Sequence, residues 1–312
     1  MEQTKALETE RRDGVTPITI SLGEIDPQKR LAAIPQYQDV AEQTAGGLHQ
    51  LLLKGGALAR MLLDLLHGTW LGHPLHTVLT DFAISAWTFG SLLDLSNLRG
   101  GSRRTRRAAD QLITAGTLFA VPTALTGITD FSTIPSEAAA TGATHGLVNA
   151  TALGFYSLSL WARKAHRRTL GAVLSGVGFA LIMLSAWLGG ELSYRYLVGV
   201  NRVKEPTETR RWQSVLDDDD LKEHKPQRVE VQGQPVLLYR HEGQIYAIGA
   251  VCAHAGGPLE EGCFTGTQVE CPWHQSVYDL HTGHVLHGPA TYPEPLYETR
   301  LRRGRLEIRL AD

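Results

Sequence analysis

Two short segments near the C-terminus combine cysteine and histidine at the spacing of metal ligands. One reads Cys252-Ala-His254 and the other reads Cys271-Pro-Trp-His274, and both lie in stretches that contain glycine and proline. Structural zinc sites usually place two cysteines in one half and two histidines in the other, whereas here each half supplies one of each. That division matches a two-iron cluster in which one iron keeps two thiolates and the other binds two imidazoles. The spacing therefore predicts a metal centre and favours an iron–sulfur cluster over zinc.

Longer stretches around these ligands resemble a known family. The segments CAHAGGPLEEG, CPWHQSVYDLHTG and GPATYPEP look like those of a bacterial Rieske [2Fe-2S] domain of ferredoxin type, over roughly residues 228–310. The resemblance implies that Cys252 and Cys271 ligate the buried iron while His254 and His274 ligate the outer iron. An EPR signal from the reduced protein would exclude zinc.

Residues beside the ligands bear on the reduction potential. High-potential members of the resembled family carry two further cysteines, at the positions of Gly257 and Trp273, so no loop disulfide is expected here. Ser276 and Tyr278 match positions whose hydroxyls bond cluster sulfurs in that class, which raises the potential. We expect an intermediate value within about −150 to +300 mV. Two alternatives would give a lower reduction potential. Gln275 stands where the family usually has glycine, and a different bend of the loop there would remove the hydrogen bond of Ser276. Alternatively, Ser276 and Tyr278 are ordinary strand residues whose hydroxyls do not bond the cluster.

The apolar middle of the chain predicts a second, all-α domain inside a membrane. Four segments reach the length of about 20 residues that crosses a bilayer core; they cover residues 74–95, 111–131, 143–162 and 170–191. They lack the polar stripe at 3.6-residue spacing that helices of a soluble bundle show. The segment that begins at residue 48 mixes charges among leucines, which favours a preceding helix at the membrane interface. The sequence therefore predicts a four-helix transmembrane bundle.

Composition changes along the chain indicate the domain order. We expect a polar N-terminal segment (1–47), the helical domain (48–200), a linker (201–227) and an all-β domain of antiparallel sheets (228–312). The linker is indicated by the acidic run from Asp217 to Asp220, and the β domain by short alternating strands and a terminal hairpin turning at Arg303 and Gly304. The third cysteine, Cys263, is expected to be a small core residue.

The charge of the loops predicts an orientation in a bacterial cytoplasmic membrane. Lysine and arginine concentrate in the first and third connections, and the second connection has neither. Basic loops stay in the cytoplasm, so the Rieske domain is expected on the outer face. Arg167 and Arg168 ahead of the last span resemble a twin-arginine export signal, and an ordinary basic loop is the alternative.

Ionisable residues gather at one end of the predicted bundle, on the side that carries the β domain. They are His73, His76, Asp130, His145 and Glu191. Charged groups at membrane depth are costly and are therefore candidates for function, here as a quinol or haem b site. The alternative is that they bond helix ends at the water interface. Residues 48–200 also resemble an uncharacterised bacterial four-helix membrane family, which implies no activity.

Three functions are compatible with these features. The first is a membrane-bound one-electron carrier that exchanges electrons with a quinol pool or a redox protein partner at the membrane face. The second is a tethered ferredoxin that feeds a separate oxygenase, and the third is a redox sensor without catalysis. The net charge of −2 argues against nucleic acid as a partner. A complete Rieske oxygenase is not expected, since no large soluble domain remains, and no glycine-rich fingerprint indicates an NAD(P) site.

Overall fold

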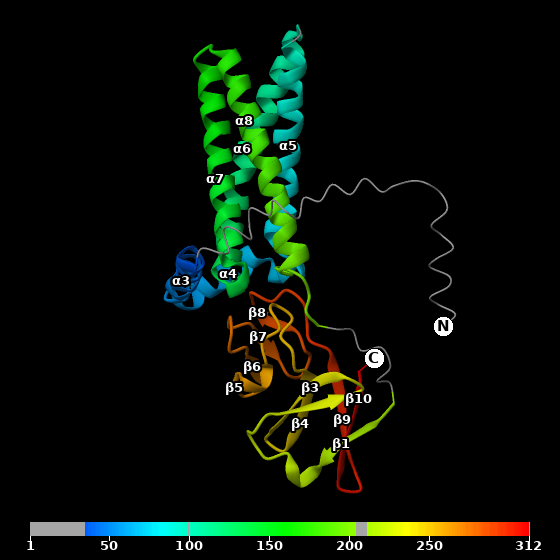
Figure 1. The fold of residues 1–312 in the computed structure, drawn as a ribbon. Helices are drawn as coiled ribbons and strands as arrows, with labels where there is room; N and C mark the ends of the chain where they lie inside the picture. Colours follow the sequence, from blue (N-terminus) through cyan, green and yellow to red (C-terminus); the bar gives the residue numbers. More distant parts are fainter. Residues whose placement is uncertain (1–34, 99, 204–210, 312) are drawn as a thin grey trace, which may run out of the picture.

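The computed structural model describes residues 35–98, 100–203 and 211–311, and it consists of a helical part followed by two β-sheets (Figure 1). Residues 1–34 of the polar segment expected at 1–47, and the linker residues 204–210, lie outside this description. The α-helices are α3 (Pro35–Leu53), α4 (Gly56–His67), α5 (Leu75–Asn97), α6 (Arg103–Ser132), α7 (Ala139–Lys164) and α8 (Arg168–Gly190), the last continued by a π-helical turn (Glu191–Arg195).

Helices α5 to α8 form an elongated bundle (Figure 1). Its core contains Trp87, Ile113, Tyr156 and Ile182, with the Trp87 and Tyr156 rings stacked at 4.3 Å between centroids. Large apolar side chains such as those of Leu118, Leu147 and Val173 instead point outward and are exposed. An apolar exterior around a packed core is the pattern that a lipid environment favours. The predicted helical domain is thus confirmed.

Not all four predicted spans meet the criteria for crossing a membrane. Within the described residues, three helices are both long and apolar enough: Leu75–Asn97, Arg103–Ser132 and Arg168–Arg195. The helix over the fourth predicted span, α7, is as long as the others but is not among them. It carries His145 and Asn149 together with several threonines and serines, which lower its mean hydropathy. These polar residues distinguish α7 in hydropathy from the three helices that meet the criteria.

Helices α3 and α4 lie at the end of the bundle that faces the β domain (Figure 1). Among the described residues, α3 covers Pro35–Leu53 and so overlaps the segment that the sequence assigned to a polar tail ending at residue 47. Lys54 and Gly55 separate the two helices, and Gly56, which begins α4, has a φ of +67°. Helix α4 exposes Leu58, Met61 and Leu65, as expected for a helix at an interface.

Two antiparallel sheets make up the β domain, as predicted. The six-stranded sheet has the order β1-β10-β9-β4-β3-β2 and the four-stranded sheet the order β5-β6-β7-β8. The strands are β1 (Gln213–Asp217), β2 (Gln227–Val231), β3 (Gln234–His241), β4 (Gln244–Gly249), β5 (Cys263–Thr265), β6 (Gln268–Glu270), β7 (Val277–Asp279), β8 (Val285–His287), β9 (Leu296–Arg302) and β10 (Arg305–Leu310). The turn between β9 and β10 lies at Arg303 and Gly304, as expected.

Two expectations about this domain were wrong. The segment Gln213–Asp217 was placed in the linker because an acidic run follows it, yet it is strand β1 and pairs with β10. The domain therefore begins before residue 228. Cys263 was expected in the core, but it lies on the short strand β5 and is exposed. A strand of three residues alternates faces, and residue type alone does not reveal which face is buried.

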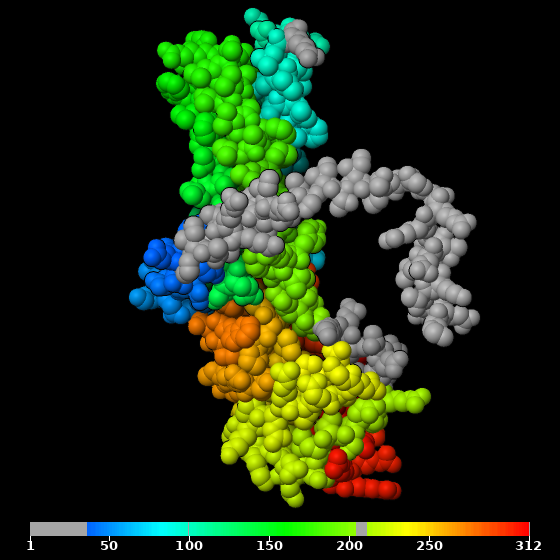
Figure 2. All heavy atoms as spheres, in the orientation of Figure 1, coloured from blue at the N-terminus to red at the C-terminus, as the bar shows by residue number. Residues whose placement is uncertain are grey.

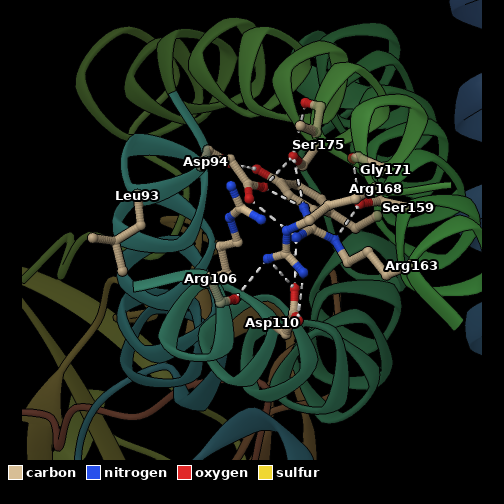
Figure 3. Close-up of polar contacts among 12 residues, drawn as sticks. Leu93, Asp94, Arg106, Asp110, Ser159, Arg163, Arg168, Gly171 and Ser175 are labelled. Atoms are coloured by element: carbon tan, nitrogen blue, oxygen red, sulfur yellow. Dashed lines mark hydrogen bonds and ion pairs between the residues drawn. The ribbon is translucent and has the colours of Figure 1, made fainter. Parts of the chain in front are cut away.

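The end of the bundle away from the β domain is held by a buried charge cluster (Figure 3). Arg163 from α7 donates to Asp94 of α5 and, at 2.7 Å, to Asp110 of α6. Arg168 also donates to Asp110, so one member of the arginine pair that resembled an export signal bonds within the bundle. Ser175 of α8 completes the cluster by donating to Asp94 at 2.8 Å. All four long helices thus meet at this end.

Candidate metal centre and its interface with the helices

The four candidate ligands lie on two loops of similar build. One loop follows β4 and carries Cys252 and His254, and the other follows β6 and carries Cys271 and His274. In the first loop the Cys252 amide donates to the Gly257 carbonyl at 2.9 Å; in the second the Cys271 amide donates to the Ser276 carbonyl at 2.8 Å. Both cysteines are free thiols and are buried. Backbone bonds therefore fix the direction in which each cysteine points.

The two histidines face each other across these loops. Their ring centroids are 4.9 Å apart and the ring planes are nearly perpendicular, at 82°. In both rings Nδ1 is buried and has no hydrogen-bond partner among the described residues. Burial lowers the pKa of His274 to about 4 and that of His254 well below its usual value, so both rings are neutral near pH 7. A neutral imidazole with an unpartnered buried nitrogen is suited to bind a metal.

This donor set fits a [2Fe-2S] cluster with mixed ligation. Each loop supplies one thiol and one imidazole, and the two imidazoles face each other. Cys252 is 1 % and Cys271 2 % exposed, whereas both histidines are less buried. The arrangement therefore offers an inner thiolate pair and an outer imidazole pair.

Ser276 and Tyr278, whose hydroxyls are predicted to bond cluster sulfurs, are both fully buried in the β domain. The Tyr278 hydroxyl is 3.3 Å from the Cys252 sulfur, and the side chain is fully buried. The Ser276 hydroxyl accepts from the Ala290 amide at 3.0 Å, which leaves its own proton free to donate. Gln275 has a φ of +63°, so it adopts the left-handed conformation that glycine favours and the loop keeps its bend. A hydroxyl at the distance of Tyr278 from the Cys252 sulfur can donate a hydrogen bond to it, and such a bond raises the reduction potential of a bound cluster.

Gly257 and Trp273 occupy facing positions in the two loops. A Cβ atom on Gly257 would lie 3.2 Å from the Trp273 ring and 2.8 Å from the Cys271 sulfur. Any side chain on Gly257 would therefore press on a candidate ligand. Because Gly257 has no side chain, the Trp273 indole can pack against it. The two loops are therefore in contact at the positions where high-potential members of the family carry cysteines.

Glu294 is a buried residue near the ligands that the sequence analysis did not single out. Its Oε1 accepts a hydrogen bond of 2.8 Å from the amide of Ala253, between the two ligands of the first loop. Burial, together with the Cys252 thiol, raises the pKa of the Glu294 carboxyl well above its usual range. Glu294 lies in the family-like stretch GPATYPEP, but no feature of the sequence marks this glutamate as buried.

The ligand loops pack directly on the helical part, as the adjoining blue and orange atoms in Figure 2 show. Asp64 of α4 makes two contacts at the end of β8: Oδ2 lies 2.7 Å from Nδ1 of His287, and Oδ1 accepts from the Gly288 amide at 2.8 Å. Arg60 of α4 forms an ion pair of 3.6 Å with Glu270. His73, a predicted membrane-face residue, instead contacts the Tyr292 hydroxyl at 3.1 Å. Through these contacts α4 and the residues just before α5 pack against the β domain beside the ligand loops.

A small pocket lies between the helices and the ligand loops. It has a volume of about 10 Å³ and is lined by His274 and Gln275 together with residues of α3 and α4 that include His49 and His67. Both nitrogens of His49 are buried without a partner among the described residues, and Nδ1 of His67 lies 3.0 Å from Asp130. The pocket has room for about one water molecule. The sequence analysis missed both histidines, although each interrupts a leucine-rich stretch.

The other predicted membrane-face residues separate into three places. His76 and His145 lie side by side between α5 and α7, with ring centroids 6.4 Å apart. Asp130 is beside His67, nearer the β domain. Glu191 pairs with Arg195 within the π-helical turn at 3.3 Å. The five residues therefore do not form a single site.

Comparison with known proteins identifies both halves of the chain. The family described as "Rieske [2Fe-2S] domain" matches residues 211–299, and the family described as "Predicted membrane protein (DUF2231)" matches residues 72–202. The ferredoxin component of the naphthalene 1,2-dioxygenase/salicylate 5-hydroxylase systems of Ralstonia sp is 31% identical over 102 residues, which are 33% of this chain and 98% of that protein.

Other relatives also match the β domain. The ferredoxin component of the naphthalene 1,2-dioxygenase system of Pseudomonas putida is 32% identical over 103 residues, covering 33% of this chain and 99% of that protein. Among solved structures, the ferredoxin of carbazole 1,9a-dioxygenase from Nocardioides aromaticivorans IC177 is 28% identical with a TM-score of 0.31, covering 31% of this chain and 96% of that one.

Proposed function

The chain belongs to the Rieske [2Fe-2S] family through its C-terminal domain, and from this premise we propose that it is a membrane-bound carrier that takes single electrons from a quinol pool at the membrane face. When bound, the cluster supplies a one-electron couple. Cys252, His254, Cys271 and His274 would hold it. The hydroxyl of Tyr278, 3.3 Å from the Cys252 sulfur, stabilises added negative charge there.

The packing of the imidazole edge against α3 and α4 is the observation that supports electron exchange through the helical half. His274 lines the pocket that it shares with His49 and His67. The Arg202 amide, which follows the last helix, donates to the Ala253 carbonyl at 3.1 Å and so covers the first loop. Electron transfer from the membrane side would need only to cross this contact. A soluble partner would first have to displace the helices.

The electron count constrains the proposed reaction. Oxidation of one quinol releases two electrons and two protons, so it reduces two protein molecules by one electron each, and the protons pass to water. The reaction then requires neither NAD(P)H nor a second cofactor in this chain.

The basic loops support an outward orientation of the β domain. The α5–α6 and α7–α8 connections lie at the end of the bundle away from the β domain (Figure 1). Arg103 and Arg104 begin α6, Lys164 ends α7, and Arg167 lies in the second of these connections. Arginine-rich loops remain cytoplasmic, which would place the cluster on the outer face. A reporter fused at the C-terminus should be active outside the cytoplasm, and activity only in the cytoplasm would reverse the orientation.

Reduction of the cluster by quinol tests the proposed function. We expect the EPR signal of the reduced cluster to appear when a short-chain quinol is added anaerobically to the oxidised protein in liposomes. Asp64→Ala should slow this reduction about tenfold or more, because hydrogen bonds to a charged group contribute about 1.5–3 kcal/mol. Asp39→Ala, which changes an exposed carboxylate on α3, is the matched control. A cluster that dithionite reduces but quinol does not would refute the proposal.

A tethered ferredoxin is the second candidate, and the sequence relatives favour it. The proteins that match the β domain over nearly their full length are ferredoxin components of dioxygenase systems. In this role the domain would leave the helices to reach a separate oxygenase. Asp64→Ala would then accelerate electron transfer to a soluble acceptor such as cytochrome c, whereas the quinol carrier loses activity with the same change.

A further inference from the structure

Three side chains of the β domain, those of Glu223, His224 and His241, form a cluster outside the ligand loops. Each residue offers one nitrogen or oxygen atom that can bind a metal, and these three atoms all lie within 4.8 Å of one another. Glu223 and His224 precede β2, whereas His241 ends β3, so the fold brings together two separate segments. Glu223 and His224 are exposed and His241 is half-buried. The cluster is therefore open to ions from solution.

Backbone contacts hold the two segments side by side. Glu223 forms a parallel β-bridge with Arg240, and the His224 amide donates to the Arg240 carbonyl at 2.9 Å. His241 pairs with Gln244 across a two-residue turn in which both residues have positive φ, as in tight hairpins. The backbone on both sides of the cluster is thus fixed by the sheet before any ion binds.

The separations between the side-chain atoms are close to those of donors on one ion. Nδ1 of His224 lies 3.4 Å from Nδ1 of His241, and Nε2 of His224 lies 3.8 Å from Oε1 of Glu223. Two donors on one tetrahedral zinc ion, each about 2.0–2.1 Å from the metal, are about 3.3–3.4 Å apart. A small rotation of these accessible side chains would bring one atom from each residue within reach of the same ion.

Tyr239 supports the ring of His224. Its hydroxyl lies 3.2 Å from Nδ1 of His224, and its own ring is buried and stacks on Phe264 at 4.3 Å between centroids. When Nδ1 carries the proton, it donates to the Tyr239 oxygen and Nε2 keeps its lone pair beside Glu223. Metal-ligating histidines typically donate their other N–H to a neighbouring group in this way. Tyr239 is therefore placed to position a ligand.

The positive charge next to the cluster is compensated. Arg240 precedes His241, but its guanidinium donates to the Leu221 carbonyl at 3.0 Å and pairs with Asp218. Successive residues of a strand point to opposite faces, so the side chains of Arg240 and His241 diverge. A cation at the cluster would meet the Glu223 carboxylate rather than an uncompensated arginine charge.

We propose that Glu223, His224 and His241 bind a divalent transition-metal ion of the Zn²⁺ class. Two imidazoles and one carboxylate are a donor set of three-ligand zinc sites, which leave a fourth position to water. The imidazoles disfavour Mg²⁺ and Ca²⁺, which prefer oxygen ligands. The ion would join the segment before β2 to the end of β3, and β2 is an edge strand of the six-stranded sheet. This site is separate from the cluster ligands and does not rest on the proposed function.

Zinc titration of the purified protein tests the proposal. Protein with its cluster intact, purified in detergent with an affinity tag that lacks histidine, should bind one Zn²⁺ per chain in competition with a chromophoric chelator. His224→Ala and His241→Ala should each weaken this binding at least about tenfold, which is the lower end of what loss of an outer-shell partner costs. An unchanged absorption spectrum of the cluster shows that the domain is folded. The matched control His284→Ala removes an exposed histidine of the same domain and should bind Zn²⁺ like wild type.

X-ray absorption at the zinc edge identifies the ligands directly. We expect nitrogen and oxygen neighbours at about 2.0–2.2 Å, with the scattering pattern of imidazole, and no sulfur neighbour at about 2.3 Å. Tyr239→Phe keeps the ring that packs on Phe264 but loses the hydroxyl, and it should weaken zinc binding about tenfold. Sulfur ligation would place the ion at a cysteine and would overturn the site. Equal zinc affinity in wild type and in both histidine variants, or no binding at micromolar zinc, would overturn it too.

Discussion

The molecule contains two pairs of histidines that face each other at nearly right angles, and their environments are opposite. His254 and His274 lie on loops, with both Nδ1 atoms buried and unpartnered among the described residues. His76 and His145 lie on helices, with each Nδ1 within 3.0 Å of a backbone carbonyl. In the helix pair Nε2 of His145 also has a partner, since the side-chain amide of Asn149 lies 3.0 Å from it. Of the two pairs, only the loop pair therefore has a buried nitrogen without a partner on both rings, among the described residues.

The two pairs also differ in what fixes the orientation of the histidine side chains. In the loops, backbone bonds at Cys252 and Cys271 direct the side chains, so the histidine rings need no hydrogen bonds of their own. In the bundle, the neighbouring helix supplies both a carbonyl and a glycine for each ring. Changes to one pair should therefore leave the other intact, which gives four predictions of decreasing effect.

The largest effect is expected from His274→Ala, which should abolish cluster binding. Removal of one of four ligands opens the cluster site to water, and iron and acid-labile sulfide should fall to background while the helical bundle stays folded. Iron analysis measures the cluster, and circular dichroism measures the helices. The control is His284→Ala, an exposed histidine of the same domain. Full cluster content in His274→Ala would show that the ligands are assigned wrongly.

A change at the end of the bundle away from the β domain should weaken the packing of the helices that carry the second histidine pair. Arg163→Met leaves the buried carboxylate of Asp94 without its charged partner, which typically costs about 3–5 kcal/mol. We expect a clear loss of thermal stability in detergent. Lys164→Met, at an exposed neighbouring position, should stay within about 0.5 kcal/mol of wild type. Equal stability of the two variants would remove the energetic role of this cluster.

Filling the space beside His76 should disturb only the helix pair. Gly127→Ala places a methyl group 2.8 Å from the His76 ring, and we expect the bundle to lose about 1–3 kcal/mol of stability, as for other overpacked positions. Gly176→Ala is the matched control, because its Cβ meets no atom within 4 Å and it carries the same gain in helix propensity. Thermal unfolding in detergent measures the effect. Identical midpoints for the two variants would contradict the close packing of this ring.

The smallest effect is expected from Tyr278→Phe, which removes one hydroxyl beside Cys252. A hydrogen bond worth about 1 kcal/mol corresponds to about 40 mV for a one-electron couple, so the cluster potential should fall by about that amount. Tyr246→Phe, from the same core, should not shift it. EPR-monitored redox titration measures the cluster potential in both variants. An unchanged potential in Tyr278→Phe would make this tyrosine an ordinary core residue.

Much of the metal centre could be predicted from the sequence because its residues are close together in the chain. Cys252, His254, Cys271 and His274 fall in two short motifs, and local turns alone bring each cysteine near its histidine. Tyr278 could be placed for the same reason, since it follows Cys271 on the next strand. The apolar helices were also predictable, because a run of about 20 apolar residues is long enough to cross the hydrocarbon core of a bilayer.

The interface between the halves could not be predicted in this way. Asp64 and His287 are 223 residues apart, and nothing near either residue indicates the other. His49 and His67 were missed because a lone histidine in a leucine-rich helix is usually an ordinary surface or core residue. Strand β1 was missed because its partner β10 is at the far end of the chain. Contacts of long sequence separation depend on the whole fold rather than on local pattern.

Locking the interface tests most directly the central claim that electrons enter the cluster through the helices. Arg60→Cys and Glu270→Cys, at a contact of 3.6 Å on half-exposed side chains, can be joined by a short bifunctional thiol reagent. Cys263→Ser should be included, because Cys263 is exposed and pairs with residue 270 across the sheet. We predict that the locked protein is reduced by quinol as fast as the unlocked one. Loss of quinol reduction on locking, with the cluster intact, would contradict the account.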